Sequence, residues 1–180
     1  MIIDIRGTHG SGKSTVIHTL LKSHPHEPIL GEDNKIHGYS ISSLNLSVVG
    51  KYETDCGGCD GVKTADEVCR RVREFSRAGN VILEGILVSH TFKRYSDLAH
   101  ELEDYRFFFL NTPLKNCIAR VRGRRIRKGN MKPFNPANLT KDWHQIWIKT
   151  RKKMQEEGHN VNVLNWKDPI PQIMETLSCL

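Results

Sequence analysis

Residues 7–14 read GTHGSGKS and match the pattern G-x-x-x-x-G-K-[ST] in full. Glycines let backbone N–H groups approach phosphate oxygens closely, and the N-terminus of a following helix favours the same negative charge. In such a loop Lys13 reaches the β- and γ-phosphates, and Ser14 offers a hydroxyl to Mg²⁺. The pattern therefore predicts a site for ATP and Mg²⁺ made of Gly7, Thr8, His9, Gly10, Ser11, Gly12, Lys13, Ser14 and Thr15.

A second group of residues suited to phosphate lies at 120–129, RVRGRRIRKG, which holds five arginines and one lysine. In a helix, Arg120, Arg124 and Arg127 share one stripe because they are spaced by four and three residues. The planar guanidinium of arginine matches the geometry of phosphate oxygens. Three partners are compatible with this cluster: a triphosphate, a nucleic-acid backbone, or solvent alone.

Positive charge is concentrated in this part of the chain. The protein has 180 residues and a formal net charge of +7. Residues 120–153 hold twelve Lys and Arg side chains against the single Asp142, which leaves a net charge of −4 for the rest. Such a regional field favours a polyanionic substrate or partner. Trp143 and Trp147 within it are interpreted as core residues of a long helix, with base stacking as the alternative.

If the ATP site serves phosphoryl transfer to a hydroxyl group, a carboxylate is needed near the acceptor to orient it and accept its proton. Three places in the chain offer such a carboxylate. Asp33 follows a short apolar stretch, and Asp55 and Asp60 flank the glycines of DCGGCD. Glu84 lies inside the apolar run VILEGILV. Because an unpaired buried carboxylate costs free energy, Glu84 is assigned to Mg²⁺ or its water shell. The alternative is that Glu84 only satisfies nearby backbone groups.

The segment 53–63, ETDCGGCDGVK, is a glycine-rich loop with two cysteines at C-x-x-C spacing. Such a pair can bind zinc, but the chain offers no matching second pair, and Cys69 falls within an expected helix. A turn at Gly57 and Gly58 whose backbone approaches the substrate accounts better for the segment. The predicted substrate-binding residues here are Lys51, Tyr52, Asp55, Gly57, Gly58 and Asp60.

Strands that alternate with helices must position these residues. MIIDIR (1–6) predicts a strand, and the residues after the glycine-rich loop predict a helix. Thr64 to Glu67 have the T-x-x-E form of a capping box that begins another helix. This alternation implies a parallel sheet covered on both faces. Further strands are expected near 29–30, on both sides of a turn at 42–43, and at 81–88, 106–111 and 161–166; further helices are expected at 92–102, from 114, at 139–154 and at the C-terminus.

Composition sets the class of protein. An apolar fraction of 38% and a charged fraction of 26% are ordinary for a soluble globular chain. The length predicts one domain over residues 1–180. The longest apolar runs are too short to span a bilayer, and the N-terminus lacks the features of a secretory signal, so we expect a cytoplasmic protein without a membrane partner. The five scattered cysteines are expected to be reduced thiols.

The second half of the chain resembles small nucleoside and nucleotide kinases of the P-loop superfamily. A strand ends in NTPL (111–114), and a helix with clustered arginines, a long helix and a last strand follow. The resemblance implies a three-layer α/β fold of the P-loop nucleotide-kinase type, with a mainly parallel sheet, helices on both faces and an arginine-rich lid at about 120–135. In that superfamily the lid closes over ATP, excludes water and places guanidinium groups against the transferring phosphate.

The same resemblance implies roles for single side chains. Kinases of this superfamily place the acceptor-side acid after the second strand, so Asp33 is the expected base, with Asp60 and Glu84 as alternatives. The expected catalytic residues are Lys13, Asp33, Arg120 and Arg124, and Arg127 is expected to contact the substrate.

Three blocks of sequence resemble a narrower group. IRGTHGSGKST (5–15), GKYETDCGGCDGVKTADEVCRRVREF (50–75) and ILEG (82–85) are similar to bacteriophage P-loop kinases, the 5-hydroxymethyluracil DNA kinases. Enzymes of that group transfer a phosphate from ATP to the hydroxymethyl group of a modified thymine analogue within DNA. The resemblance implies DNA with modified bases as the substrate, in the cytoplasm of a phage host. A base must leave the stack for such chemistry, which would give Tyr52 or Phe134 a role.

Two other functions fit parts of the sequence. In a free nucleoside or nucleotide kinase, the arginines would serve only the phosphates of small molecules. A nucleic-acid-binding NTPase is the third reading, although 180 residues hold no second motor core. The salt dependence of substrate affinity distinguishes the DNA kinase from the free nucleoside or nucleotide kinase, because affinity for DNA falls steeply as salt rises. The sequence leaves the oligomeric state and the nucleotide donor open.

Overall fold

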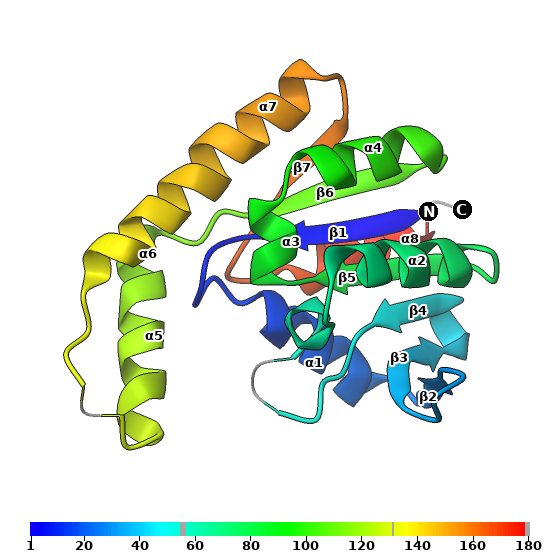
Figure 1. Cartoon of the computed structure of the whole chain (residues 1–180), viewed down its shortest axis with the longest axis horizontal. Coiled ribbons are helices and arrows are strands. Elements are labelled where there is room, and N and C mark those ends of the chain that lie inside the picture. Colours follow the sequence, from blue (N-terminus) through cyan, green and yellow to red (C-terminus); the bar gives the residue numbers. More distant parts are fainter. Residues whose placement is uncertain (55–56, 131, 179–180) are drawn as a thin grey trace.

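The computed structural model describes residues 1–54, 57–130 and 132–178. In this part of the chain, seven strands form one sheet with helices on both of its faces (Figure 1). The strands are β1 Ile2–Arg6, β2 Glu27–Leu30, β3 Ile36–Ile41, β4 Leu46–Val49, β5 Asn80–Glu84, β6 Tyr105–Leu110 and β7 Asn160–Leu164. The α-helices are α1 Lys13–Ser23, α2 Ala65–Ser76, α3 Ile86–His90, α4 Lys93–Glu101, α5 Leu114–Arg127, α6 Pro136–Trp143, α7 Arg151–Glu156 and α8 Ile170–Ser178.

The sheet has the order β2-β3-β4-β5-β1-β6-β7. The neighbours from β4 to β7 pair in parallel, whereas β3 pairs antiparallel with both β2 and β4. The expected α/β class with a mainly parallel sheet is therefore confirmed. The second strand of the chain, however, is the outermost strand, and three strands separate it from β1.

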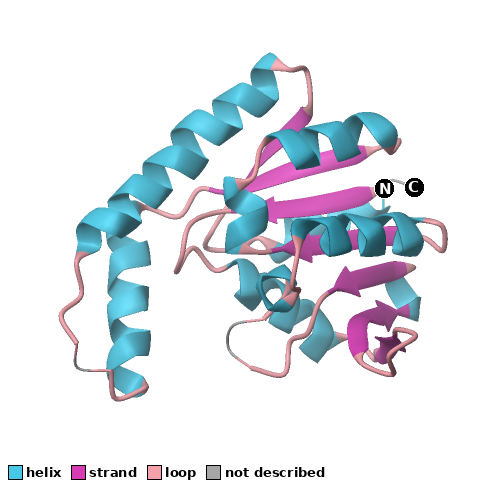
Figure 2. Cartoon of the chain, in the orientation of Figure 1, coloured by secondary structure: helices cyan, strands magenta, loops and turns pink. Residues whose placement is uncertain are grey.

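Alternation along the strands divides the core into two layers. Ile3 and Ile5 of β1 pack with α1 and α8, as Ile82 of β5 and Phe108 of β6 do. Ile2 of β1 and its neighbours Val81, Leu83, Phe107 and Phe109 pack on the other face, under the helices that follow β4, β5 and β6. Side chains of successive strand residues point to opposite faces, so strands apolar throughout need cover on both sides. Figure 2 shows this arrangement, with the sheet in magenta between cyan helices.

Helix α5 leads away from the sheet and then meets the long helical segment that returns to β7 (Figure 1). That segment consists of α6, a π-helical stretch His144–Thr150, and α7. The expected long helix is therefore present, with Ile146, Thr150 and Met154 buried on one side. A small separate core of Cys117, Val121 and Leu139 joins α5 to α6. We call residues 114–135 the α5 arm.

None of the helices in the described residues is both long and apolar enough to span a membrane.

Candidate active site

The glycine-rich loop between β1 and α1 has backbone conformations that favour glycine. Gly10 has a φ of 76° and Gly12 a φ of 108°, in the left-handed region that strains other residues. A Cβ on Gly10 would also lie 2.6 Å from the carbonyl oxygen of Cys117. Glycine at this position therefore lets helix α5 pack directly on the loop. GTHGSGKS has the strand, turn and helix context that a P-loop requires.

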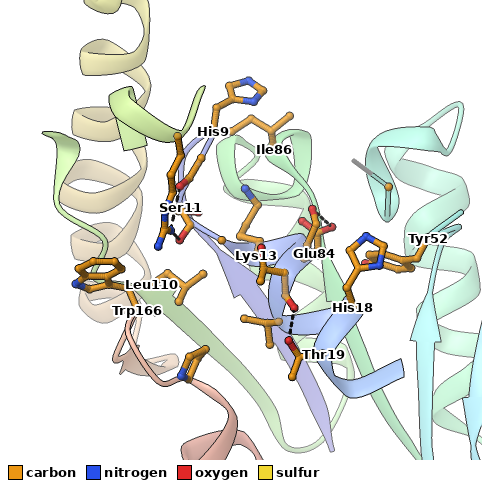
Figure 3. Close-up of a pocket in the computed structure, with 18 of the residues that line it drawn as sticks. His9, Ser11, Lys13, His18, Thr19, Tyr52, Glu84, Ile86, Leu110 and Trp166 are labelled. Carbon is orange, nitrogen blue, oxygen red and sulfur yellow. Dashed lines mark hydrogen bonds between the residues drawn. The ribbon is translucent and has the colours of Figure 1, made fainter. Parts of the chain in front are cut away.

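Lys13, the first residue of α1, holds its ammonium group beneath the loop. Its Nζ donates hydrogen bonds to the carbonyl oxygens of Gly7 at 2.7 Å and Thr8 at 3.3 Å. Burial lowers the pKa of Lys13, and the nearby carboxyl of Glu84 acts in the opposite direction. In Figure 3 the side chain lies between Ser11 and Glu84. Both hydrogen-bond partners are neutral carbonyls, so the positive charge is free to meet a phosphate.

Ser14 and Glu84 form a pair of oxygen donors next to Lys13. The Ser14 hydroxyl donates to Glu84 Oε1 at 3.0 Å, and Glu84 is buried at the end of β5. Burial raises the pKa of Glu84 to about 7, against the lowering effects of Lys13 and of the hydrogen bond from Ser14. A carboxyl perturbed in this way within a cleft is typical of functional sites. Hydroxyl and carboxylate oxygens are also ligands that Mg²⁺ accepts, so this pair fits a magnesium ion.

A cleft of 1250 Å³ opens beside these groups. It is lined by the P-loop and the start of α1, the loop after β4, the end of β5, one side of α5 and residues 166–170 after β7. These segments meet at the carboxyl ends of the parallel strands, where open α/β sheets bind their ligands. The cleft brings together most of the predicted ATP and substrate residues.

The arginine stripe expected from residue spacing faces this cleft. Arg120, Arg124 and Arg127 all line it. Arg120 Nη1 donates to the P-loop carbonyl oxygens of Ser11 at 3.0 Å and Gly10 at 3.3 Å. Its guanidinium also lies 4.9 Å from the ring centroid of Trp166. The first half of the α5 arm is thus fixed on the loop, and the two further arginines extend along the cleft.

Asp60 adds a second carboxylate to the lining of the cleft. Its carboxylate accepts hydrogen bonds from the backbone N–H groups of Ile86, at 2.8 and 3.0 Å, and of Leu87, at 3.1 Å. These bonds cap the first turn of α3 and fix the orientation of the carboxylate. Asp60 lines the cleft together with Lys13 and Glu84. It also contributes to the electrostatic field at both of those side chains.

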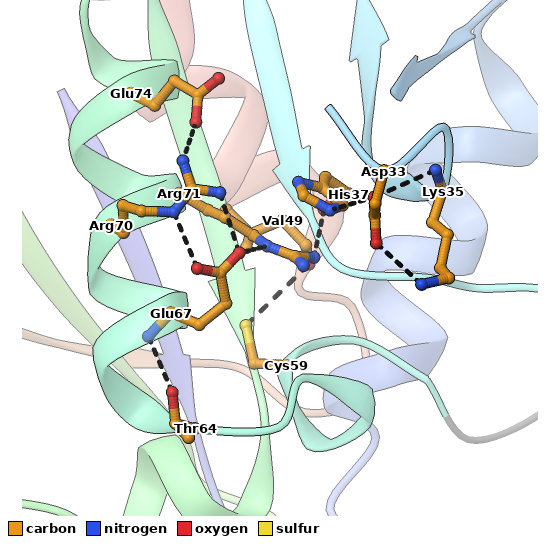
Figure 4. A network of polar contacts seen from close by, with 10 residues as sticks. All are labelled: Asp33, Lys35, His37, Val49, Cys59, Thr64, Glu67, Arg70, Arg71 and Glu74. Atoms are coloured by element: carbon orange, nitrogen blue, oxygen red, sulfur yellow. Dashed lines mark hydrogen bonds and ion pairs between the residues drawn. The ribbon is translucent and has the colours of Figure 1, made fainter. Parts of the chain in front are cut away.

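Asp33, the expected base, lies elsewhere, and the prediction is corrected. It is absent from the cleft lining that the described residues form. Its carboxylate pairs with Lys35 at 2.9 Å and His37 at 3.1 Å in the turn between β2 and β3 (Figure 4). Hydrogen bonds from Lys35 hold the pKa of Asp33 at about 2. The reason is strand order: β4 and β5, which lie nearer the P-loop, carry the acids that reach the cleft.

The predicted substrate loop divides into lining and supporting residues. Tyr52 and Gly57 line the cleft, as Asp60 does. Gly58 is buried instead, and a Cβ there would lie 2.5 Å from Glu84 Oε1. The backbone carbonyl of Lys51 accepts a hydrogen bond from the Gly58 N–H at 2.7 Å. The Lys51 side chain pairs with Glu53 and does not line the cleft. The prediction for Asp55, and Cys56 of the C-x-x-C pair, fall outside the described residues.

The structure adds lining residues that sequence reasoning missed. Trp166 and the residues up to Ile170 follow β7 and close one end of the cleft. Their position directly after the carboxyl end of a parallel strand could have identified them as cleft residues. His18 lies one helical turn after Ser14 and contacts the Tyr52 ring at 5.5 Å between centroids. Helical spacing from Ser14 could have identified it.

Comparison with known proteins decides the family. The profile of the 5-hmdU DNA kinase family matches residues 1–158 of this chain. The chain belongs to the 5-hmdU DNA kinase family. Membership of that family makes the protein a kinase, and it confirms the family resemblance of the three sequence blocks.

Individual relatives of this kinase are phage proteins. A 5-hmdU DNA kinase from Pseudomonas phage PaMx11 is 38% identical over 166 residues, which cover 87% of this chain and 86% of the relative. A 5-hmdU DNA kinase from Delftia phage PhiW-14 is 30% identical over 162 residues, which cover 81% of this chain and 60% of the relative.

Two solved structures are also similar to this member of the 5-hmdU DNA kinase family. A gluconokinase from Sinorhizobium meliloti 1021 has a TM-score of 0.48 and 13% identity, with 97% of this chain and 87% of that chain covered. A deoxyadenosine kinase from M. mycoides has a TM-score of 0.48 and 15% identity, with 100% of both chains covered.

Proposed function

We propose that the protein transfers the γ-phosphoryl group of ATP to the hydroxymethyl group of 5-hydroxymethyluracil bases within DNA, in the cytoplasm of a phage host. The names of its relatives supply the acceptor. The observation that carries the chemistry is one cleft in which a P-loop, an oriented carboxylate and three arginines meet. Phosphoryl transfer depends mainly on positioning and charge stabilisation, and these are the groups that it needs.

Asp60 is the proposed general base in place of Asp33. The acceptor hydroxyl oxygen attacks the γ-phosphorus, and its proton passes to the Asp60 carboxylate. The bond between the γ-phosphorus and the bridging oxygen breaks, and ADP leaves with that electron pair. The backbone N–H groups of Ile86 and Leu87 keep the carboxylate in place during the transfer. The product is a phosphomonoester on the base.

Cationic groups on both sides of the cleft stabilise the charge that is redistributed in this step. Lys13 and Arg120 approach the P-loop, where the β- and γ-phosphates are expected, and Arg124 and Arg127 line the cleft beyond them. Ser14 and Glu84 would hold Mg²⁺ directly or through water. When bound, Mg²⁺ would neutralise phosphate oxygens and orient the triphosphate.

The lid at about 120–135 forms the outer part of the α5 arm. Its root is fixed, because Arg120 bonds the P-loop and Cys117 packs against Gly10. Closure would therefore bring Arg124 and Arg127 toward the transferring phosphate while Arg120 stays in place. Residues 1–180 are proposed to act as one domain, because strands from both ends of the chain pair in one sheet.

The charge distribution supports a DNA acceptor over a free nucleotide. Arg120, Arg124 and Arg127 line the cleft and account for three of the twelve cationic residues between 120 and 153. Lys128, Lys132, Lys141 and Lys149 are also exposed, on the α5 arm and the long helical segment beside it. A mononucleotide has too few phosphates to use them all, whereas a DNA backbone carries a charge at every nucleotide.

Labelled ATP, offered with a panel of acceptors, tests the proposal. The panel contains mononucleotides, plain DNA and DNA with 5-hydroxymethyluracil. We expect label in the hydroxymethyluracil DNA alone, and none when Lys13→Ala replaces the wild type. Label in a free nucleoside or nucleotide would favour the small-molecule kinase. Phosphate release stimulated by plain DNA, without a labelled acceptor, would favour the nucleic-acid-binding NTPase.

A further inference from the structure

Two histidines and a glutamate meet on the side of the molecule away from the cleft. His100 lies in the last turn of α4, Glu157 follows α7, and His159 precedes β7. Strand β7 runs parallel to β6 and β1, and these residues lie at its beginning. The P-loop follows the carboxyl end of β1, so the two sites lie at opposite ends of the parallel strands. None of the groups assigned to the kinase reaction belongs to this cluster.

The three side chains are close enough to share one ion. Each offers one ligand atom, and these three atoms all lie within 4.8 Å of one another. The rings of His100 and His159 are 4.5 Å apart between centroids, and His159 Nε2 is 4.0 Å from Glu157 Oε2. Ligand atoms bound about 2 Å from a common Zn²⁺ lie roughly 3–4 Å apart. Rotation of the exposed His100 and Glu157 side chains can supply the small remaining contraction.

The surroundings hold the least exposed ligand in a fixed position. The buried Ser96 hydroxyl of α4 donates to Glu157 Oε2 at 2.8 Å and lies 2.7 Å from His159 Nε2. The His159 ring also packs against Phe107 at 5.3 Å between centroids, and its side chain is only 5% exposed. The hydrogen bond from Ser96 to Glu157 and the packing on Phe107 are outer-shell contacts of the kind that orient ligands at metal sites. An ion bound at His159 Nε2 would replace the contact of that nitrogen with Ser96.

We propose that His100, Glu157 and His159 bind one divalent transition-metal ion of the zinc class. Two imidazoles and one carboxylate match the donors that Zn²⁺ accepts, with water in the remaining position. The ion links α4, α7 and β7, so it stabilises the attachment of the long helical segment that leads back to the α5 arm. This role is structural and independent of the acceptor.

Metal binding to the full-length protein tests the site. The protein is freed of metal with a chelator, exchanged into excess Mg²⁺ to occupy sites that prefer oxygen ligands, and titrated with Zn²⁺ by calorimetry. Co²⁺ is then added in place of Zn²⁺, because its absorption spectrum distinguishes nitrogen and oxygen ligands from cysteine thiolates. His159→Ala, His100→Ala and Glu157→Gln are compared with His26→Ala, which removes an exposed histidine outside the cluster.

We expect one equivalent of Zn²⁺, a raised thermal midpoint, and a Co²⁺ spectrum without a thiolate band. Each of the three ligand variants should weaken binding at least about tenfold and lose the thermal shift, whereas His26→Ala should match the wild type. His100→Ala and Glu157→Gln keep the test valid if His159→Ala does not fold, because both alter exposed side chains. Equal binding by wild type and all three ligand variants, no binding at all, or a thiolate band would overturn the proposal.

Discussion

Asp60 and Asp33 are two carboxylates that follow strands, and they differ in their position relative to the cleft and in their partners. Asp60 accepts backbone N–H groups at the start of α3 and faces the cleft. Asp33 pairs with Lys35 and His37 in a turn at the sheet edge. Hydrogen bonds from Lys35 hold the pKa of Asp33 at about 2, which makes this carboxylate a poor proton acceptor. Substitution of each aspartate should therefore give different kinetics.

Asp60→Asn should lower kcat by about a hundredfold or more while the KM for ATP changes little, because proton acceptance is lost in the transition state alone. Asparagine still caps helices well, so the thermal midpoint should stay near that of the wild type. Steady-state kinetics with hydroxymethyluracil DNA provide the measurement. Asp33→Asn is the matched control and should keep wild-type kcat. A large loss in Asp33→Asn with normal Asp60→Asn kinetics would restore the original assignment.

Glu84 makes the stability of the nucleotide-free protein depend on pH. Its pKa rises on folding from 4.5 to about 7, so the folded state binds a proton that the unfolded state has released between these values. The stabilising contribution is fully present below about pH 4.5 and is lost as pH rises through about 7. A shift of this size corresponds to about 3 kcal/mol.

Glu84→Gln should remove this dependence. We expect the free energy of unfolding of the variant, relative to wild type, to increase by up to about 3 kcal/mol between pH 4.5 and pH 8. Urea unfolding without nucleotide or Mg²⁺ at several pH values measures the difference, and all other titrating groups cancel. A difference that stays constant across this range would show that folding does not raise the pKa of Glu84.

At the scale of single elements, helix α5 presents arginines with two different environments. Arg124 belongs to the stripe that lines the cleft. Arg122 is exposed on the same helix and is absent from the cleft lining among the described residues. Arg124→Gln should lower kcat at saturating ATP and DNA by on the order of a hundredfold, as loss of one charged donor to a transition state does.

Arg122→Gln provides the control for this prediction, because it removes the same charge two residues away. Its kcat should stay within a few-fold of the wild type, since the side chain makes no contact with the cleft. Single-turnover measurements on both variants separate the chemical step from product release. Similar losses in the two variants would mean that α5 contributes only a general positive field.

Elements with local signals were predictable from the sequence. The capping box at Thr64 predicts α2, and the Thr64 hydroxyl indeed accepts from the Glu67 N–H at 3.1 Å. The P-loop and the arginine stripe are also local patterns, because a turn and a helix each relate residues only a few positions apart. The structure therefore places them as the sequence predicted.

Features that depend on contacts between distant segments were not predictable. The position of β2 at the sheet edge depends on strand order, which has no local signature, and so Asp33 was assigned wrongly. Arg6 is another case, because its charged side chain is fully buried in the core. It pairs with Asp4 at 2.8 Å and packs over the rings of Tyr95 and Phe107. A single strand sequence does not reveal the partners that two other elements, α4 and β6, supply.

At the scale of the whole molecule, the charge is asymmetric: a basic α5 arm and long helical segment adjoin a mildly acidic remainder. Lys149 and Lys152 are exposed on the long helical segment. Arg151 differs from them, because it bonds the Trp147 carbonyl at 3.0 Å and packs on its ring. If DNA follows this surface, the two lysines should act as phosphate contacts and leave base recognition unchanged.

Lys149→Gln combined with Lys152→Gln should therefore weaken DNA binding uniformly across sequences while ATP binding stays constant. The plot of log affinity against log salt concentration should become shallower by about one for each lysine that no longer neutralises a phosphate. Fluorescence anisotropy over a range of salt concentrations measures this slope. Lys22→Gln combined with Lys35→Gln removes the same charge from other surfaces and should leave the slope near wild type. Equal slopes in both double variants would mean that the long helical segment lies outside the DNA path, because net charge alone would then account for the effect.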